Sequence, residues 1–169
     1  ISGVGGGVAQ FAFLFAKAAA ANVYVTSSSD DKIDFCVAQG AKGGFNYRTE
    51  GWHKEVFKMT DGFDLVIDSS GGDQINDYIK LMKPAGSIVF YGATNGLPAN
   101  VDLYKMFWNQ VSLIGSTMGN DQEFEEMMAF VVQHNLKPII DSVRPLADAI
   151  EAFDDMKDGK QFGKLVLIT

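Results

Sequence analysis

The sequence has few of the residues that build covalent cross-links and metal sites: one cysteine and two histidines among 169 residues. Cys36 cannot form an internal disulfide, and a single unpaired cysteine is typical of a reducing compartment, so we expect a cytoplasmic protein. Cys36, His53 and His134 do not follow the ligand spacing of a zinc site, and we expect no zinc in this chain. Cys36 falls in an apolar helical pattern and is interpreted as a core residue.

Positive charge is also scarce. The 14 Lys and Arg against 21 Asp and Glu give a net charge of −7, whereas non-specific binding to nucleic acid or to a membrane surface needs an excess of basic residues. The longest apolar stretch, residues 11–21, is interrupted by Lys17 and is shorter than the roughly 20 residues of a membrane span. It also lacks the basic start and cleavage site of a signal peptide. We expect neither nucleic acid nor membrane as a partner.

Apolar residues are plentiful, at 47% of the sequence, which is enough for one substantial core. Short apolar runs alternate with helical patterns along the whole chain. This alternation indicates parallel strands covered by helices on both faces, so we expect an α/β fold, a three-layer doubly wound parallel sheet (Rossmann fold). Strands are expected at 22–27, 43–47, 64–70, 87–92, 111–116 and 163–169, and helices at 7–20, 30–39, 52–60, 73–82, 102–108, 120–134 and 147–156.

The first residues read ISGVGGGVAQFAF. A glycine cluster before an apolar helical pattern usually lies between a strand and a helix, yet only Ile1 and Ser2 precede this cluster. We interpret these two residues as the end of a first strand, and we expect the chain to be a piece of a longer protein.

The glycines at positions 3, 5, 6 and 7 give this turn room for a phosphate. In doubly wound sheets the first strand-to-helix turn brings backbone N–H groups against a pyrophosphate, and the helix N-terminus favours the anion. Ala9 takes the place of the last small residue of the G-x-G-x-x-G pattern. Such a turn can be purely structural, but its place before an apolar helix favours a dinucleotide site.

The end of the second strand distinguishes the two nicotinamide cofactors. NAD-binding sheets usually carry an acidic residue there, which holds the ribose hydroxyls. Here the place is taken by Ser27 and Ser28, with Lys32 one turn inside the next helix, and this set accommodates a 2′-phosphate. The same serines could simply cap the helix. We expect NADP(H) as the cofactor, with NAD the less favoured choice.

Several stretches together resemble the medium-chain dehydrogenase/reductase superfamily, in its zinc-type alcohol dehydrogenase-like and quinone oxidoreductase branch. They are GVGGGVAQFA, VTSSSDDKIDFCVAQGA, NYRTEGW, FDLVIDSSGG, LMKPAGSIVFYGAT and GKQFGKLVLIT. The resemblance covers nearly the whole chain and is to the cofactor-binding domain. It implies an oxidoreductase that transfers hydride to or from a quinone, enone, aldehyde or alcohol, with the substrate bound by a catalytic domain that this chain lacks. We therefore expect the chain alone to be inactive.

The resemblance also implies domain limits and site residues. Residues 1–143 would form the NADP-binding domain, and residues 144–169 would pack on the catalytic domain. The implied cofactor residues lie at the ends of successive strands; they are Gly5, Gly6, Gly7, Val8, Ser27, Ser28, Lys32, Tyr47, Ser69, Ser70, Gly71, Tyr91, Gly92, Ala93, Ser116 and Thr117, with Met118 beside them. Lys164 is interpreted as a solvated lysine, and no catalytic residue is assigned.

Two other functions are compatible with a glycine-rich first turn. An S-adenosylmethionine-dependent methyltransferase would use the same turn, but it needs an acid at the end of the second strand. A non-catalytic dimerising nucleotide-binding module is the other alternative, because an apolar edge strand at 111–115 could pair with a second copy. We expect a homodimer through this strand.

Overall fold

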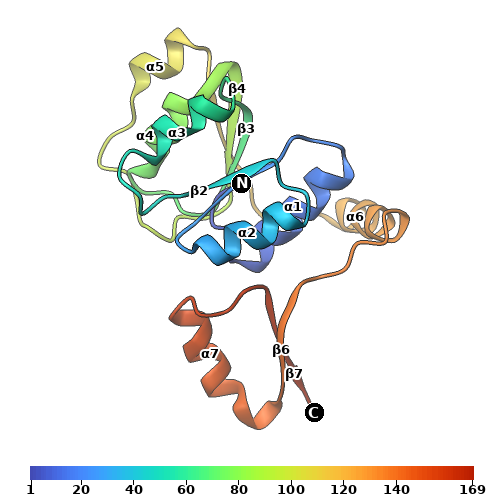
Figure 1. Cartoon of the computed structure of the whole chain (residues 1–169). Helices are drawn as coiled ribbons and strands as arrows, with labels where there is room; N and C mark the ends of the chain where they lie inside the picture. The colour runs from blue at the N-terminus through green and yellow to red at the C-terminus, as the bar shows by residue number, and fades with distance from the viewer.

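The computed structural model describes residues 1–169, and its helices and strands alternate along the chain (Figure 1). The main body contains α1 (Gly7–Ala18), β1 (Tyr24–Ser27), α2 (Asp30–Ala38), β2 (Gly43–Asn46), α3 (Trp52–Met59), β3 (Phe63–Asp68), α4 (Gln74–Leu81), β4 (Met82–Phe90), α5 (Leu103–Trp108), β5 (Ser112–Gly115) and α6 (Asp121–Gln133). A C-terminal unit follows, made of β6 (Ile140–Pro145), the short η1 (Leu146–Asp148), α7 (Ala149–Lys157) and β7 (Lys164–Ile168).

The strands of the main body are all parallel. β1 pairs with β2, and β3, β4 and β5 form a second sheet in that order. The segment Ile1–Val4 lies between these two sheets: the carbonyl of Ile1 accepts from the amide of Thr26 (3.0 Å), and the amide of Ser2 donates to the carbonyl of Ile67 (2.9 Å). The order across the body is therefore β2, β1, Ile1–Val4, β3, β4, β5. This confirms the expected doubly wound α/β fold.

Helices cover both faces, and each face has its own core. On one face α3 and α4 pack on the sheet through a cluster that includes Trp52, Val56, Tyr78 and Ile79. On the other face α1 and α2 contribute Phe13 and Cys36, which pack against Val23 and Val25 of the β1 region. Sheet and two helical layers together give the three layers that the sequence predicts.

The elements that the sequence predicts agree with the structure to within a few residues except at β4, and β6 and η1 are elements that it does not predict. The sequence predicts a break at Pro84 and Gly86 before a strand that starts at 87. Instead β4 begins at Met82, directly after α4, because Phe63 pairs with Met82 and the register then shifts so that Leu65 pairs with Ser87. The residues that look like a break therefore form a bulge inside the strand.

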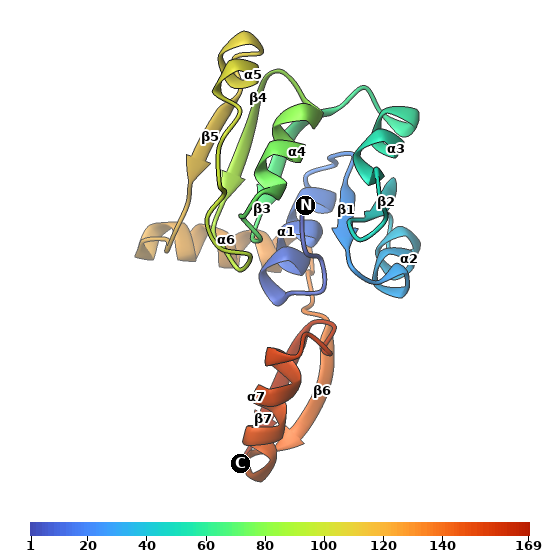
Figure 2. The ribbon, with the colours of Figure 1, turned by 90° about the vertical axis from the view of Figure 1, so that its left-hand side faces the viewer.

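Most of the C-terminal unit projects from the main body in both views (Figures 1 and 2). Its two strands pair only with each other, and an ion pair of 2.8 Å joins Arg144 to Asp155 of α7. The domain limit expected after residue 143 falls inside β6. No helix of the chain has the length and apolar character needed to cross a membrane.

Candidate cofactor-binding site

The turns that carry the expected site residues lie at the carboxyl ends of the parallel strands, where ligands of open α/β sheets bind. The glycine turn, residues 3–7, follows the central segment Ile1–Ser2. Ser27 ends β1, residues 69–72 follow β3, residues 91–96 follow β4, and residues 116–118 follow β5. The structure therefore brings the expected residues to one edge of the sheet.

The glycine turn leaves open space at its centre. Gly6 has an extended backbone (φ −80°, ψ 148°) directly before α1, and a Cβ atom there would meet only the carbonyl of Gly3, at 3.6 Å. Gly6 and Val8 are exposed. Gly3, in contrast, has φ +61°, so this position needs glycine for its conformation. Because the amide groups at the start of α1 have no helical partners, the turn can receive an anion.

Two lysines from distant parts of the sequence flank this turn. The ammonium group of Lys32, on α2, lies 3.2 Å from the position that a Cβ of Gly5 would occupy. It donates to the carbonyls of Gln161 (2.8 Å) and Gly159 (3.2 Å). Lys164, on β7, extends over Gly7, with its ammonium group 2.9 Å from the corresponding Cβ position. Two positive charges therefore lie beside the N-terminus of α1, and both suit a phosphate group.

The C-terminal unit contacts the glycine turn through residues 159–164. Besides the two lysine contacts, the amide of Gly163 donates to the carbonyl of Gly5 (3.3 Å), and the rings of Phe35 and Phe162 pack edge to face with centroids 4.8 Å apart. These contacts place part of the segment 144–169, which the resemblance assigns to packing on a catalytic domain, beside the glycine turn.

Asp68, at the end of β3, organises the neighbouring turn and was not singled out from the sequence. It is fully buried, and its carboxylate accepts from the hydroxyls of Ser2 and Ser70 (2.5 Å each) and from the amides of Ser70 (3.1 Å) and Gly71 (2.8 Å). The hydroxyl of Ser2 also accepts from the amide of Ser69 (3.0 Å). The carboxylate thus fixes the turn after β3 against the segment that leads into the glycine turn.

The turns after β3 and β4 bond to each other. The amide of Gly72 donates to the carbonyl of Gly96 (2.8 Å), and that of Asn95 donates to Ser70 (2.8 Å). A Cβ at Gly92 would lie 2.9 Å from the carbonyl of Ser69, so only glycine permits this close approach. Ser69, Ser70, Gly71, Gly92 and Ala93 therefore form one continuous surface.

Tyr91 is half-buried beside this surface. Its amide donates to the carbonyl of Asp68 (3.0 Å), and burial raises the pKa of its phenol above the usual value. Further along the edge, the amide of Ser116 donates to Phe90 (2.9 Å), while Ser116, Thr117 and Met118 are exposed.

At the other end of the site, Ser27 is buried and its hydroxyl accepts from the amide of Ser29 (3.2 Å). This bond closes a local turn before α2, whose N-cap is Ser29 and has no side-chain capping bond, and Ser28 is the more accessible of Ser27 and Ser28. The amide of Tyr47 donates to the carbonyl of Ser27 (3.2 Å), which brings the exposed Arg48 to this end of the edge. The sequence analysis did not identify Arg48 as a candidate cofactor residue, although its position directly after Tyr47, beyond the end of β2, could have indicated it.

The chain does not present a fit for zinc. No three His, Cys, Asp or Glu side chains lie together as a possible ligand set. Cys36 is fully buried in the apolar core between α1 and α2, and burial raises the pKa of its thiol to about 11, which disfavours the thiolate that a metal needs.

Comparison with known proteins identifies relatives for almost the whole chain. The family model described as zinc-binding dehydrogenase matches residues 7–133. A zinc-type alcohol dehydrogenase-like protein of Leptosphaeria maculans is 40% identical over 99% of this chain and 49% of its own length. Another, of Schizosaccharomyces pombe, is 32% identical over 96% of this chain and 49% of its own length. The chain spans about half the length of these curated relatives.

A solved structure gives the same result in three dimensions. A crystal structure described as an NAD-dependent alcohol dehydrogenase is 33% identical and has a TM-score of 0.91, with 99% of this chain and 50% of that chain covered. The glycine turn, the doubly wound sheet and these matches agree with one another. The chain belongs to the zinc-binding dehydrogenase family of the medium-chain dehydrogenase/reductase superfamily, as a cofactor-binding domain.

Proposed function

We propose that this chain binds NADP(H) within an oxidoreductase that transfers hydride between the nicotinamide and a quinone, enone, aldehyde or alcohol. The observation that carries the proposal is the glycine turn, which opens onto free space at the N-terminus of α1 between the ammonium groups of Lys32 and Lys164. An anionic diphosphate suits this combination of unpaired amides and two positive charges.

The pyrophosphate would lie over Gly5, Gly6, Gly7 and Val8. Lys32 has used two of its three N–H donors on the carbonyls of Gln161 and Gly159, so one remains for a phosphate oxygen. The ammonium of Lys164 is exposed and can turn toward the same group. Lys32 would therefore bind the pyrophosphate, whereas the sequence placed it near the 2′-phosphate.

At the adenosine end, Ser28, Tyr47 and Arg48 would surround the 2′-phosphate, with Ser27 holding the backbone. The nearest acid of α2, Asp30, accepts from the side-chain amide of Asn46 (2.9 Å). No carboxylate stands at the end of β1 to hold ribose hydroxyls or repel a phosphate. These features favour NADP(H), although the solved relative above is described as NAD-dependent.

The remaining residues would hold the ribose and the nicotinamide. Ser69, Ser70 and Gly71 follow β3, near the middle of the sheet, whereas Tyr91, Gly92 and Ala93 follow β4 and Ser116 and Thr117 follow β5. When bound, the cofactor supplies the hydride, and this chain orients it. No residue of this chain is assigned to substrate binding or to acid–base chemistry. The buried, unpaired Cys36 suits a cytoplasmic enzyme.

Calorimetric titration with NADPH, NADH and S-adenosylmethionine at one moderate salt concentration tests the proposal. We expect NADPH to bind at least about tenfold more tightly than NADH, because a 2′-phosphate gains charge-assisted hydrogen bonds. Arg48→Gln should remove most of that preference and leave NADH unchanged. Equal affinities would overturn the choice of NADP(H), and binding of S-adenosylmethionine alone would overturn the oxidoreductase.

A further inference from the structure

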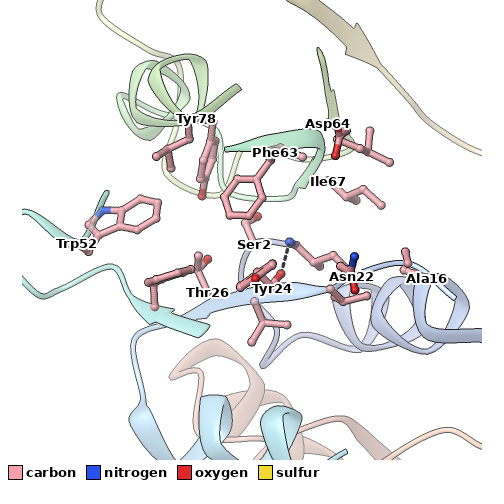
Figure 3. A pocket seen from close by; sticks show the side chains of 18 of the residues that line it. Ser2, Ala16, Asn22, Tyr24, Thr26, Trp52, Phe63, Asp64, Ile67 and Tyr78 are labelled. Carbon is pink, nitrogen blue, oxygen red and sulfur yellow. Dashed lines mark hydrogen bonds between the residues drawn. The ribbon is translucent and has the colours of Figure 1, made fainter. Parts of the chain in front are cut away.

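The strand β1 has different surroundings on its two sides. Toward β3 lies the largest cavity of the chain, about 360 Å³, and 15 of its 19 lining residues are hydrophobic (Figure 3). Thr26 lines this cavity, whereas Ser27 does not. Toward β2 the surroundings are polar, because Ser27 pairs with Asn46 and the N-cap of α2, Ser29, follows shortly after it. Polar contacts to an adenosine ribose at the end of β1 are therefore expected from β2 and α2.

The side-chain amide of Asn46 makes two hydrogen bonds at this end of the sheet. Its NH₂ group donates to the carboxylate of Asp30, the first residue of α2, at 2.9 Å. Its carbonyl oxygen accepts from the backbone amide of Arg48 at 3.0 Å. A carboxylate only accepts and a backbone N–H only donates, so a single orientation of the amide satisfies both partners. The side chain of Asn46 is therefore held in one position between α2 and the turn after β2.

Asp30 is the acid that the Asn46 amide controls. Its carboxylate is directed toward the end of β2 by this bond, but the residue is exposed, so other side-chain rotamers are open to it once the bond is lost. In NAD-binding sheets a carboxylate near the end of this strand accepts from the ribose hydroxyls. The same charge would repel a 2′-phosphate. The direction of the Asp30 side chain therefore matters for the choice of cofactor.

Arg48 supplies the opposite charge at the same place. It is exposed, and none of the ion pairs of the chain includes it. A free guanidinium can bind a phosphate through two parallel hydrogen bonds. If Asp30 were released from Asn46, its carboxylate could pair with this guanidinium and compete with the phosphate for it.

We propose, on the basis of the function proposed above, that Asn46 is a positioning residue that determines the choice between NADP(H) and NAD(H). It acts on Asp30 rather than on the cofactor. By holding the Asp30 carboxylate on the β2 side, it leaves the guanidinium of Arg48 without a competing acid. The end of β1 then favours a 2′-phosphate over free ribose hydroxyls.

A double-mutant cycle tests this role. NADPH and NADH are titrated by calorimetry, at one moderate salt concentration, into the starting chain, Asn46→Ala, Asp30→Asn and the variant with both substitutions. Asn46→Ala removes the bond to Asp30 without adding a charge, and Asp30→Asn removes the charge alone. Asn109→Ala is the matched control, because Asn109, which follows α5, is half-buried like Asn46 and its side chain makes no hydrogen bond. A thermal melt checks that each variant is folded.

We expect Asn46→Ala to lower the ratio of NADPH affinity to NADH affinity at least about fivefold. The affinity for NADH should stay the same or rise, because the released carboxylate accepts from ribose hydroxyls. Adding Asp30→Asn should return the ratio to within about twofold of that of the starting chain, since the two residues act through one contact. Asn109→Ala should leave the ratio unchanged.

Three results would overturn the inference while leaving the proposed function in place. They are an unchanged ratio in Asn46→Ala, an equal loss of affinity for both cofactors, and a ratio in the double variant as low as in Asn46→Ala alone. The second would show that Asn46 only supports the end of β2. A starting chain that binds neither cofactor would overturn the proposed function, and this inference with it.

Discussion

Gly6 acts through the space that it leaves free. Its backbone is extended, a conformation that any residue adopts, and a Cβ atom there would contact nothing closer than the Gly3 carbonyl at 3.6 Å. The fold therefore does not need glycine at this position. The ligand needs it, because a larger side chain would fill the space above the unpaired amides of α1.

We predict that Gly6→Val abolishes cofactor binding and leaves the fold intact. The added atoms would occupy the place of the pyrophosphate, so affinity for NADPH should fall at least about 100-fold, while the melting temperature should change by only a few degrees. A thermal melt with and without NADPH measures both effects, because a ligand that binds the folded state raises the melting temperature.

Ala19→Val is the matched control for this change, since it adds the same two methyl groups at an exposed position at the other end of α1. In the control variant, NADPH should raise the melting temperature as much as it does in the starting chain. If NADPH raised the melting temperature of Gly6→Val equally, these glycines would form only a structural turn.

Asp68 is a second residue that organises the site, through the hydrogen bonds of its carboxylate. Four donors converge on its buried carboxylate, and they hold the turn that leads to Ser69, Ser70 and Gly71. We predict that Asp68→Asn destabilises the protein by about 2–4 kcal/mol, because the new NH₂ group faces donors and leaves buried groups unpaired. Denaturant unfolding gives the free energy, and weaker NADPH binding should accompany it.

Asp64→Asn provides the comparison for that prediction. Asp64 lies on the same strand, but its side chain is 84% exposed and pairs only with Lys83 at the surface. Surface pairs of this kind contribute about 0–1 kcal/mol. A similar decrease in the free energy of unfolding for both substitutions would show that the hydrogen bonds of Asp68 do not stabilise the turn.

At the scale of elements, the buried amino group that begins the segment Ile1–Val4 makes stability depend on pH. Burial lowers the pKa of the Ile1 ammonium from 8.0 to about 6. As pH falls from 8 to 6, the unfolded chain takes up this proton before the folded chain does, so stability falls with pH. We predict a loss on the order of 2 kcal/mol across this window for the 169-residue chain, measured by unfolding at several pH values.

Acetylation of the Ile1 nitrogen should remove that dependence, because an amide does not titrate. The unmodified chain, unfolded under the same conditions, is the comparison. A slope that survives acetylation would contradict the assignment of the effect to the Ile1 amino group.

Most elements could be predicted from the sequence because each depends on local patterns. The acidic start of α6, with its capping box of Asn120 and Glu123, is readable without a structure. The early start of β4 is not, because it depends on the pairing of Phe63 with Met82. The glycine turn was predicted from its local pattern, whereas the site residues of the turns after β3, β4 and β5 were implied by the family resemblance.

The contacts between those turns could not be predicted. Lys164 was interpreted as a solvated residue, yet β7 brings it over Gly7. Asp68 looks like any polar residue after a strand, and only its burial beside Ser2 reveals the network. Such contacts join residues far apart in the chain, and strand or helix periodicity carries no information about them.

At the scale of the whole molecule, one edge of the main sheet remains uncovered. β5 pairs only with β4, and the side chain of Ile114 on it is 47% exposed. Nearby, α5 presents exposed aromatic side chains at Tyr104, Phe107 and Trp108, and the rings of Tyr104 and Trp108 are stacked. Exposed apolar edges are a liability in a monomer, so they favour pairing with a second copy.

We predict that the protein forms a homodimer in which two β5 strands pair about a two-fold axis. Ile114→Lys should shift the dimer toward monomer, because a lysine on an edge strand opposes pairing and, in a symmetric contact, brings two like charges together. Sedimentation velocity across a concentration series measures the distribution of the two species.

Val132→Lys distinguishes loss of an interface from a general effect of charge, because Val132 is 76% exposed and belongs to α6 rather than to β5. This variant should remain dimeric. A starting chain that sediments as a monomer at high concentration would contradict the prediction. Dissociation by both variants would move the interface from the β5 edge to a surface that includes α6, whose side chains are almost all exposed.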